Sequence, residues 1–201
     1  MKLIGSYTSP YVRKISVILL EKDIPFEFVN DPPTSAGSKV TEFNPLGKVP
    51  ALLTDEGEVF YDSPIIVQYL ELLNIAPTLL PWEPLEALRV KQVAALADGV
   101  TDAAVALVLE NRRDASQRNE QWLIRQRGKV LRGLDQLEKY ASEGQRLNGE
   151  SLNVADISVA CTLGYLNFRH IAPGWCVERP TLIKLVERLF TRESFARTRP
   201  S

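Results

Sequence analysis

Two short stretches in the first third of the chain place polar side chains where a helix is expected to begin. Ser9 directly precedes Pro10, and Asp62-Ser63 directly precedes Pro64. Serine and aspartate are favoured N-cap residues and proline is favoured in the first helical turn, so both stretches predict helix starts. A helix start also presents unpaired backbone N–H groups and a positive dipole end, which attract a carboxylate or another anionic group.

A third stretch, Val49-Pro50, can do chemistry through its backbone. The cis form of an X-Pro bond costs only about 0.5–1 kcal/mol over the trans form, so a fold can hold it cis. In that form the backbone of Val49 would point outward and could pair with an extended peptide as a short added strand. On the proline alone, an ordinary loop before a strand is the better explanation of the pattern.

Other reactive side chains are few. His170 is the only histidine, and Cys161 and Cys176 are the only cysteines. Their spacing fits no metal-binding or redox motif, and a single histidine gives little support to a catalytic triad. We therefore expect a loop or core position for His170, a buried and inert Cys161 on an apolar helix face, and no bound metal.

The elements that must position these residues follow from the pattern of the first 75 residues. Short strand-like runs alternate with helical periodicities, and Asp55-Glu56-Gly57 indicates a hairpin turn. This is the thioredoxin-like order, in which the first two strands are parallel and the last two form a hairpin. The expected strands cover residues 2–6, 26–29, 49–54 and 58–60, and the expected helices cover 10–22, a short stretch ending near 43, and 62–73.

After about residue 75 the pattern changes to long helical stripes, which predict a helical bundle. The intervening stretch carries Pro77, Pro81 and Pro84 and is typical of a stiff linker. The sequence thus predicts an α/β thioredoxin-like domain over residues 1–75, a linker over 76–83 and an all-helical domain over 84–201. The four stripes run from Leu88 to Leu107, Leu123 to Ala141, Val154 to Phe168 and Leu182 to Phe190.

Composition limits the classes of function. The 201 residues carry 24 basic and 25 acidic side chains, a net charge of −1, which does not favour nucleic acid as a partner. We expect no membrane partner, because no apolar run approaches the ~18 residues needed to span a bilayer. Polar residues follow the first methionine too closely for a signal peptide, and two cysteines fit a reducing cytoplasm.

Four segments carry a resemblance when they are taken together. They are Tyr7 to Lys14, Asn44 to Leu52, Asp62 to Ile66, and Asn153 to Asp156. In this order they resemble the cytosolic glutathione transferases, of the bacterial kind that has serine rather than tyrosine or cysteine in the active site. The resemblance extends from Lys2 to about Phe195 and implies a thioredoxin-like domain, a helical-bundle domain and glutathione as co-substrate.

The resemblance assigns the glutathione contacts to the first domain. It implies that Val49, before a cis Pro50, pairs with the cysteinyl backbone of the tripeptide. Ser63 would take the γ-glutamyl carboxylate, with Asp62 near the ammonium group. Lys48 would pair with the glycyl carboxylate.

Ser9 is the catalytic residue that the resemblance implies. Glutaredoxins have a cysteine before the proline, whereas Ser9 precedes Pro10 here, so disulfide exchange by this residue is excluded. The serine hydroxyl would donate a hydrogen bond to the glutathione sulfur and, with the helix dipole, lower the thiol pKa from about 8.5. The thiolate would then attack a small hydrophobic electrophile without a covalent enzyme intermediate. Tyr7 is the main competitor, because other classes use a nearby tyrosine, and Thr8 and Ser6 are lesser candidates.

The resemblance also carries expectations for the second domain. The electrophile would lie against the first two long helices, where Asp102, Val105 and Ala106 stand at about the right height. Asp98 would reach the γ-glutamyl amine of the neighbouring subunit in a homodimer. The segment from Asn153 to Asp156 is expected to be a capping box that supports folding.

Two other functions stay open. Some relatives keep the fold as glutathione-binding, interaction or regulatory proteins without transferase activity, although the retained Ser9 and Val49-Pro50 argue against this. A glutathione-dependent reductase or dehalogenase is the second alternative, and the absence of a cysteine at position 9 counts against the reductase. Pro64 departs from the small residue more common in the family and removes one N–H, which leaves the γ-glutamyl contacts open.

Overall fold

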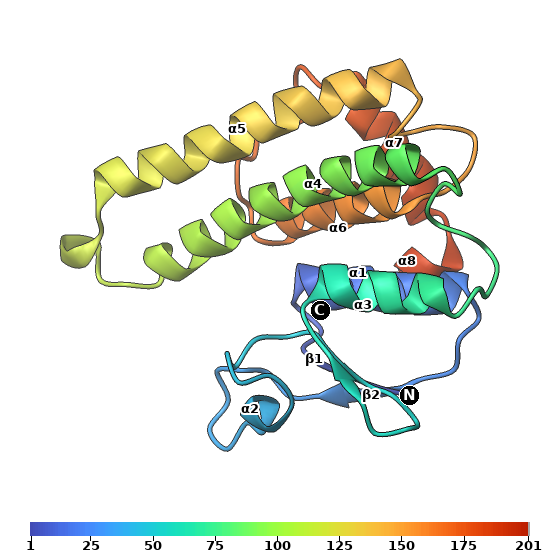
Figure 1. The fold of residues 1–201 in the computed structure, drawn as a ribbon. Coiled ribbons are helices and arrows are strands. Elements are labelled where there is room, and N and C mark those ends of the chain that lie inside the picture. The colour runs from blue at the N-terminus through green and yellow to red at the C-terminus, as the bar shows by residue number, and fades with distance from the viewer. Residues whose placement is uncertain (201) are drawn as a thin grey trace. The chain divides into compact units, whose positions relative to one another are not determined.

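The computed structural model describes residues 1–200, and these divide into two units. The first unit comprises Met1–Leu79 together with the described residues from Thr191 onward. The second unit comprises Leu80–Phe190. Each unit has its own hydrophobic core and its own secondary structure, which Figure 1 labels.

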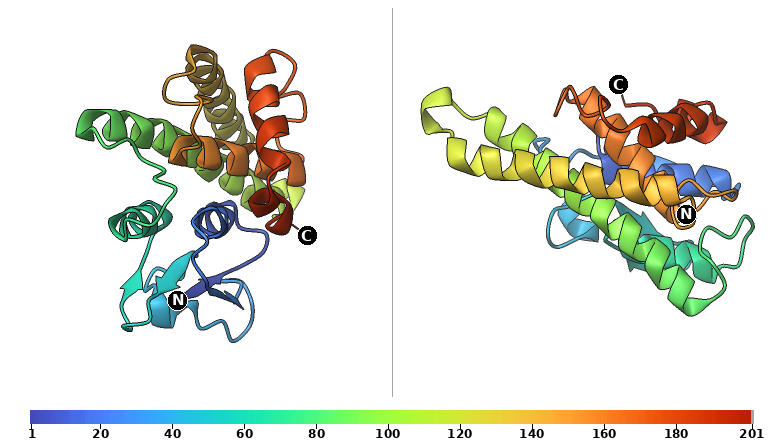
Figure 2. Two further views of the ribbon diagram at one scale, coloured as in Figure 1. Left: turned by 90° about the vertical axis from the view of Figure 1, so that its right-hand side faces the viewer. Right: turned by 90° about the horizontal axis from the view of Figure 1, so that it is seen from above.

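The first unit has the strand and helix order that the sequence predicts. A four-stranded sheet has the order β2-β1-β3-β4, with β1 and β2 parallel and the other pairs antiparallel. Helices α1 and α3 lie side by side on one face of this sheet (Figures 1 and 2). The thioredoxin-like arrangement is therefore confirmed. Its elements are β1 (Lys2–Gly5), α1 (Pro10–Glu21), β2 (Glu27–Asn30), α2 (Val40–Phe43), β3 (Ala51–Leu53), β4 (Val59–Phe60) and α3 (Ser63–Leu72).

The register of the sheet brings three loops to one edge. Ile4 of β1 pairs with Ala51, the first residue of β3, and the next residues of β3 pair with β4. Because β3 runs antiparallel to both neighbours, its start lies beside the ends of β1 and β4. The loops after β1 and β4 and the loop before β3 therefore meet. We call this place the loop edge, and it comprises residues 6–9, 48–50 and 61–63.

Helix α1 is capped by Ser9 at its N-terminus, and its apolar face fixes its position. The Ser9 hydroxyl accepts a hydrogen bond from the backbone N–H of Val12 at 3.3 Å. Val12, Ile15 and Leu19, the predicted helical stripe, are all at most 2% exposed. Burial of each such side chain stabilises the fold by roughly 1.5–3 kcal/mol, so the start of α1 has a well-determined position.

The end of the chain returns to α1. Helix α8 (Glu193–Arg197) packs against it, and the buried guanidinium of Arg13 donates to the carbonyl oxygen of Phe195 at 3.2 Å. The same guanidinium donates to the Thr198 hydroxyl at 3.4 Å and lies over the Phe195 ring. Groups of the C-terminal segment thereby help to satisfy the buried charge of Arg13.

One ion pair and one buried lysine also tie the ends of the first unit to α1. Arg192 donates two hydrogen bonds to the Glu21 carboxylate, and they hold the pKa of Glu21 below its ordinary value. Lys22 is buried and donates to the carbonyl oxygens of Ile75 at 2.7 Å and Pro77 at 2.8 Å. The first unit thus includes the start of the stretch predicted as linker and the end of the stretch predicted as helical domain.

The second unit is a bundle of long helices, as the sequence predicts. Helix α4 packs along both α5 and α6, and α7 packs against the same two helices. Figure 2 shows α4 and α5 as two long neighbouring helices. Helix α6 is buried along almost its whole length. The bundle comprises α4 (Pro84–Asn111), the short η1 (Ala115–Gln117), α5 (Glu120–Glu143), α6 (Val154–Phe168) and α7 (Pro180–Phe190).

A complete capping box starts α6 and confirms the expectation for this segment. The Asn153 side chain accepts from the backbone N–H of Asp156 at 3.1 Å, and Asp156 accepts from the backbone N–H of Asn153 at 3.0 Å. Asp156 also accepts from the N–H of Asn148 at 2.7 Å. Burial raises the pKa of the Asp156 carboxyl, and both hydrogen bonds oppose that rise. The motif therefore fixes α6 and the loop before it.

Helices α4 and α5 approach each other closely at Gly133. A Cβ atom at this position would lie 2.2 Å from the Cγ2 atom of Val100. Nearby, the hydroxyls of Thr101 on α4 and Thr162 on α6 lie 2.8 Å apart and are hydrogen bonded. The bundle core thus combines a contact that excludes any side chain at 133 with a buried, satisfied polar pair.

The expectation that no apolar run reaches membrane-spanning length is wrong for α4. By length and composition alone, this 28-residue helix is apolar enough to cross a membrane. The core helix of a soluble protein passes the same test, and 44% of the apolar window is buried inside the structure. Val93, Ala97 and Ala104 are among its buried residues, which explains why α4 is apolar without requiring a bilayer.

Candidate functional site

The Ser9 hydroxyl stands at the loop edge with one hydrogen-bonding function still available. Its oxygen accepts from the N–H of Val12, and the side chain is half-buried. A serine hydroxyl has two acceptor lone pairs and one proton, so capping leaves the proton available for donation. The capping interpretation and the ligand interpretation of Ser9 are therefore compatible.

The loop before β3 has the conformation that the sequence predicts. The Val49-Pro50 peptide bond is cis, Pro50 is buried and Val49 is half-buried. Gly47, two residues earlier, has a φ of +61°, which glycine adopts without the steric penalty that a Cβ atom brings. The backbone of Val49 thus reaches the loop edge in a defined geometry.

Asn44 holds this loop together. Its buried side chain donates to the carbonyl oxygen of Lys48 at 3.0 Å and accepts from the N–H of Leu46 at 3.0 Å. The sequence analysis included Asn44 in the segment from Asn44 to Leu52 but predicted no role for its side chain. The Asn-Pro pair could have indicated this role, because an asparagine side chain often hydrogen bonds to the backbone two residues on. Asn44 is therefore a positioning residue for Val49.

The start of α3 leaves two polar side chains for a ligand. Asp62 occupies the N-cap position, where its carbonyl oxygen accepts from Ile65 and Ile66, but its exposed side chain makes no capping hydrogen bond. Ser63 is only 2% exposed, at the first position of the helix. The Tyr61-Asp62 peptide bond is cis although residue 62 is not a proline. Sequence reasoning did not anticipate this bond.

The remaining candidates of the first unit differ in their surroundings. Lys48 is exposed next to Val49. Tyr7 is 57% exposed and stacks on the Phe28 ring with centroids 4.7 Å apart. Ser6 and Thr8 are half-buried in the same loop. The structure therefore brings Ser9, Lys48, Val49, Pro50, Asp62 and Ser63 to one edge of one unit.

The candidates from the second half of the chain lie in the other unit. Asp98 and Asp102 are on α4, with Val105 and Ala106 one turn further along. Cys161 is buried, as expected, and His170 lies in the loop after α6. Within residues 1–200, no group of three or more histidine, cysteine, aspartate or glutamate side chains is placed to hold a metal ion.

Comparison with known proteins identifies the family. Residues 3–76 match the model of the glutathione S-transferase N-terminal domain, and residues 113–188 match that of the C-terminal domain. A relative from Escherichia coli K12, described as the uncharacterized GST-like protein YibF, is 58% identical over 200 residues, 100% of this chain and 98% of its own. The chain therefore belongs to the glutathione S-transferase family.

Solved structures agree with this assignment. A glutathione S-transferase from Methylobacillus flagellatus with GSH bound is 37% identical, with a TM-score of 0.93 over 100% of this chain and 99% of that chain. A family member from Pseudomonas fluorescens with bound S-(propanoic acid)-glutathione is 38% identical, with a TM-score of 0.86 over all of both chains.

The maleylacetoacetate isomerase of Pseudomonas aeruginosa is a sequence relative that is 33% identical over 146 residues, 68% of this chain and 69% of its own. The proteins similar to this chain thus include structures with bound glutathione and a relative named as an isomerase.

The role of Asn44 leads to a first prediction. Asn44→Ala removes two hydrogen bonds from a buried loop, so we expect a loss of about 1–3 kcal/mol in the free energy of unfolding and a weaker affinity for glutathione. Urea unfolding and calorimetric titration with glutathione measure the two effects. Gln68→Ala, at an exposed position of α3, is the control and should change neither. An Asn44→Ala protein that is destabilised but binds glutathione as tightly as wild type would limit Asn44 to folding.

Proposed function

We propose that this chain is a glutathione transferase that binds glutathione at the loop edge and conjugates it to small hydrophobic electrophiles. Val49 pairs with the cysteinyl backbone, and Ser63 receives the γ-glutamyl carboxylate at the positive end of α3. The unused carboxylate of Asp62 faces the ammonium group, and Lys48 reaches the glycyl carboxylate. Ser9 is the catalytic residue, because its free proton is donated to the glutathione sulfur.

One observation carries this proposal. Three groups of different chemistry meet at one edge of one sheet: a hydroxyl donor at the start of α1, a cis X-Pro backbone before β3, and a nearly buried serine at the start of α3. Glutathione presents a thiol, a peptide backbone and a carboxylate in the matching order. The bound GSH and glutathione adducts in the structural neighbours support the same ligand for this chain.

The reaction follows from the stabilised thiolate. A hydrogen bond to the charged form of the sulfur and the dipole of α1 lower the thiol pKa, which raises the thiolate fraction near neutral pH. The sulfur pair then forms an S–C bond to an electrophilic carbon. In a displacement the leaving group departs with its bonding pair, whereas in an addition to an activated double bond the neighbouring carbon takes up a proton.

The isomerase relatives support a second candidate. Reversible addition of a thiolate to a conjugated double bond, rotation and elimination would return glutathione and leave the double bond isomerised. This route uses the same activated sulfur, so the loop edge serves both reactions equally well. The similarity to the maleylacetoacetate isomerase of Pseudomonas aeruginosa is the observation that favours it.

Parallel measurements on the purified protein separate these functions. Calorimetry with glutathione tests binding, and thiol consumption is followed with a haloarene, an unsaturated carbonyl compound and a maleyl-type cis double bond. We expect glutathione to bind and the haloarene to consume thiol. Isomerisation of the cis compound without thiol consumption would instead favour the isomerase. Absence of binding at millimolar glutathione would contradict both and favour an interaction protein that keeps only the fold.

Two further parts of the proposal concern the surroundings of the protein. We infer a cytoplasmic location, where glutathione is abundant, and a role in detoxification. We also infer a homodimer, because large apolar side chains are exposed in both units. Leu72 on α3 is 77% exposed and Trp82 before α4 is 93% exposed. Such side chains are enriched at protein interfaces, and a second copy of the chain would cover them.

A further inference from the structure

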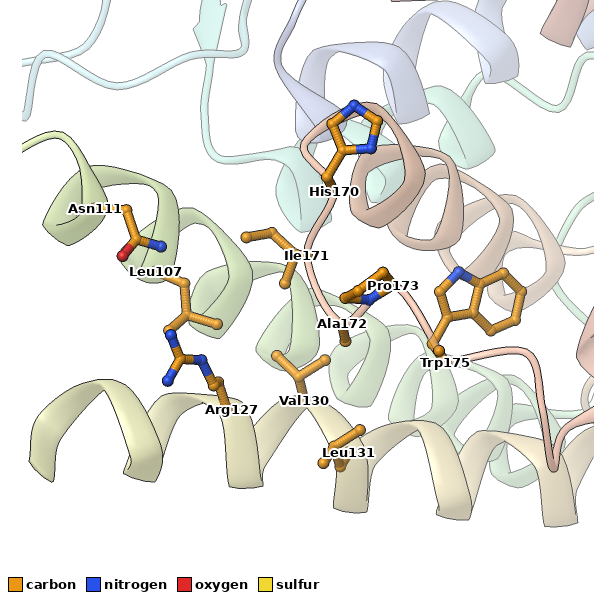
Figure 3. Close-up of a pocket in the computed structure, with 11 residues that line it drawn as sticks. Leu107, Asn111, Arg127, Val130, Leu131, His170, Ile171, Ala172, Pro173 and Trp175 are labelled. Carbon is orange, nitrogen blue, oxygen red and sulfur yellow. The ribbon is translucent and has the colours of Figure 1, made fainter. Parts of the chain in front are cut away.

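Each of the two units contains a cavity. The cavity of the second unit, of about 460 Å³, is formed by α4, α5 and the loop between α6 and α7 (Figure 3). It lies along the two helices against which the electrophile is expected, so we assign it no separate function. The smaller cavity, of about 160 Å³, lies in the first unit and shares only Ser6 and Tyr7 with the loop edge.

Three segments of the first unit form the walls of the smaller cavity. One face of α1 supplies Val12, Ser16 and Leu20, which follow one another at helical spacing. Two phenylalanines come from the region of β2, and residues 197–199 come from the C-terminal segment. Sites that enclose a whole small molecule typically have about 300–1,000 Å³. This cavity is therefore sized for one functional group of a ligand.

The charged side chains at this cavity are all arginines. Arg13, Arg197 and Arg199 line it, whereas no aspartate or glutamate among residues 1–200 does. Arg13 is already engaged by the C-terminal segment. Arg197 pairs with Glu193 at 3.5 Å in an exposed ion pair, which an anion can replace at little cost. Arg199 is exposed and has no ion-pair partner in the described part of the chain.

Ser16 supplies an independent indication of a ligand. It is only 6% exposed and lines the cavity together with the residues four positions before and after it. A serine inside a helix commonly donates to the carbonyl oxygen four residues earlier. The Ser16 hydroxyl makes neither this hydrogen bond nor any other within residues 1–200. A polar group that is nine-tenths buried and unpaired in this way is available to an oxyanion in the cavity.

The donors favour a phosphoryl group over a carboxylate. Two exposed guanidinium groups and one hydroxyl line the cavity from two different segments. A carboxylate offers them one negative charge and two oxygens. A phosphate monoester carries a charge of about −1.5 to −2 at pH 7 and has three terminal oxygens. The guanidinium fork also matches phosphate oxygens through paired N–H donors.

Part of the cavity wall is aromatic. The rings of Tyr7 and Phe28 are stacked, with an angle of 23° between their planes, and Phe26 lines the same cavity. More than half of Tyr7 is exposed, so the stacked pair still offers surface to a ligand. Aromatic rings pack favourably against a further ring in an offset or edge-to-face arrangement. The body of the ligand is therefore expected to be aromatic.

From these observations we propose that the first unit binds a small aromatic phosphate monoester at this cavity. Ser16 and Arg199 donate to the phosphoryl oxygens, and Arg197 exchanges its surface partner for the same group. The aromatic body packs against Tyr7 and Phe28. Binding needs neither Ser9 nor glutathione, so the proposal is independent of the function proposed above.

The experiment is a calorimetric titration of the full chain with phenyl phosphate, repeated with inorganic phosphate and with benzoate. We expect phenyl phosphate to bind more tightly than either. Arg199→Met and Ser16→Ala should each weaken its binding about tenfold, as the loss of a hydrogen bond to a charged group requires. Ser16→Ala breaks no hydrogen bond of the free protein, and alanine favours the helix, so urea unfolding should show no loss of stability.

Lys39→Met is the matched control for the loss of positive charge. Lys39 is exposed in the same unit and does not line the cavity, so this variant should bind phenyl phosphate as wild type does. All three variants should bind glutathione as wild type does, because none of them changes a residue of the loop edge.

Four results would overturn the proposal. Wild-type affinity in both Arg199→Met and Ser16→Ala would place phenyl phosphate elsewhere, and an equal loss in Lys39→Met would reduce its binding to nonspecific attraction. Equal affinity for inorganic phosphate or benzoate would contradict recognition of an aromatic phosphate ester. Displacement by saturating glutathione would place phenyl phosphate at the loop edge. Failure of the protein to bind glutathione would leave this proposal intact, so the two proposals are tested separately.

Discussion

Ser9→Ala is expected to raise the pKa of bound glutathione by about one to two units and to lower kcat/KM about ten- to hundredfold. The reason is that a hydrogen bond to a charged group contributes roughly 1.5–3 kcal/mol, and each pKa unit corresponds to about 1.4 kcal/mol. Ultraviolet absorbance of the thiolate as a function of pH measures the first effect, and initial rates with a haloarene measure the second. The fold loss should be complete below the thiol pKa of the wild-type complex and should disappear above the pKa of free glutathione, where the thiol ionises without help.

Two further variants separate chemistry from capping. Ser9→Ala also removes the cap of α1, which is expected to cost about 1 kcal/mol of stability. Ser9→Asp keeps a capping oxygen but replaces the donor by an anion, so it should retain the stability and still raise the thiol pKa. Ser6→Ala, in the same loop, should change neither quantity. An unchanged thiol pKa in Ser9→Ala would transfer the role to another hydroxyl of the loop, with Tyr7→Phe and Thr8→Val as the next variants.

Gly133→Ala is expected to destabilise the helical unit by about 1–3 kcal/mol, the usual cost of overpacking. The added Cβ would lie 2.2 Å from Val100 Cγ2, a distance that no relaxed contact allows. The helices must therefore separate, or the Val100 side chain must leave its position in the buried core. Urea unfolding followed by circular dichroism measures the change in the free energy of unfolding.

Gly99→Ala is the matched control for this change. It adds the same methyl group to a glycine of α4, but nothing lies within 4 Å of the new Cβ. Alanine has the higher helix propensity, so Gly99→Ala should stabilise by about 0.5–1 kcal/mol. The double variant Gly133→Ala with Val100→Ala should recover part of the loss, because it removes the methyl groups that clash. Equal effects of Gly133→Ala and Gly99→Ala would contradict the close approach of α4 and α5.

Much of the fold could be predicted from the sequence, because its signals are local. Alternation, helical stripes and turn residues located the strands and helices to within a few residues, with the shortest strand, β4, placed by its hairpin turn. Pro10 and Pro64 marked helix starts through their own backbone geometry. The capping box from Asn153 to Asp156 is complete within four residues, so its sequence pattern was sufficient.

What the sequence could not predict depends on contacts between distant residues. Helix α8 is only five residues long, and its place is set by the buried Arg13, far away in the chain. Asn44 acts through two backbone groups that its loop brings within 3.0 Å. The pocket lined by Leu107, Arg127 and Trp175 is formed by α4, α5 and the loop between α6 and α7. The distances between these elements do not follow from any local sequence pattern. The roles of the residues at the loop edge remain predictions, which the Ser9 and Asn44 variants test.

The return of the chain end to α1 has a consequence for biosynthesis. A ribosome releases the N-terminal residues first, and domains generally begin to fold in that order. Yet two hydrogen-bond acceptors of Arg13, the Phe195 carbonyl and the Thr198 hydroxyl, emerge only when synthesis is almost finished. Until then these two hydrogen bonds cannot form. The first unit is therefore completed last, and in a nascent chain stalled before residue 195 we expect α1 to lack its contacts with α8.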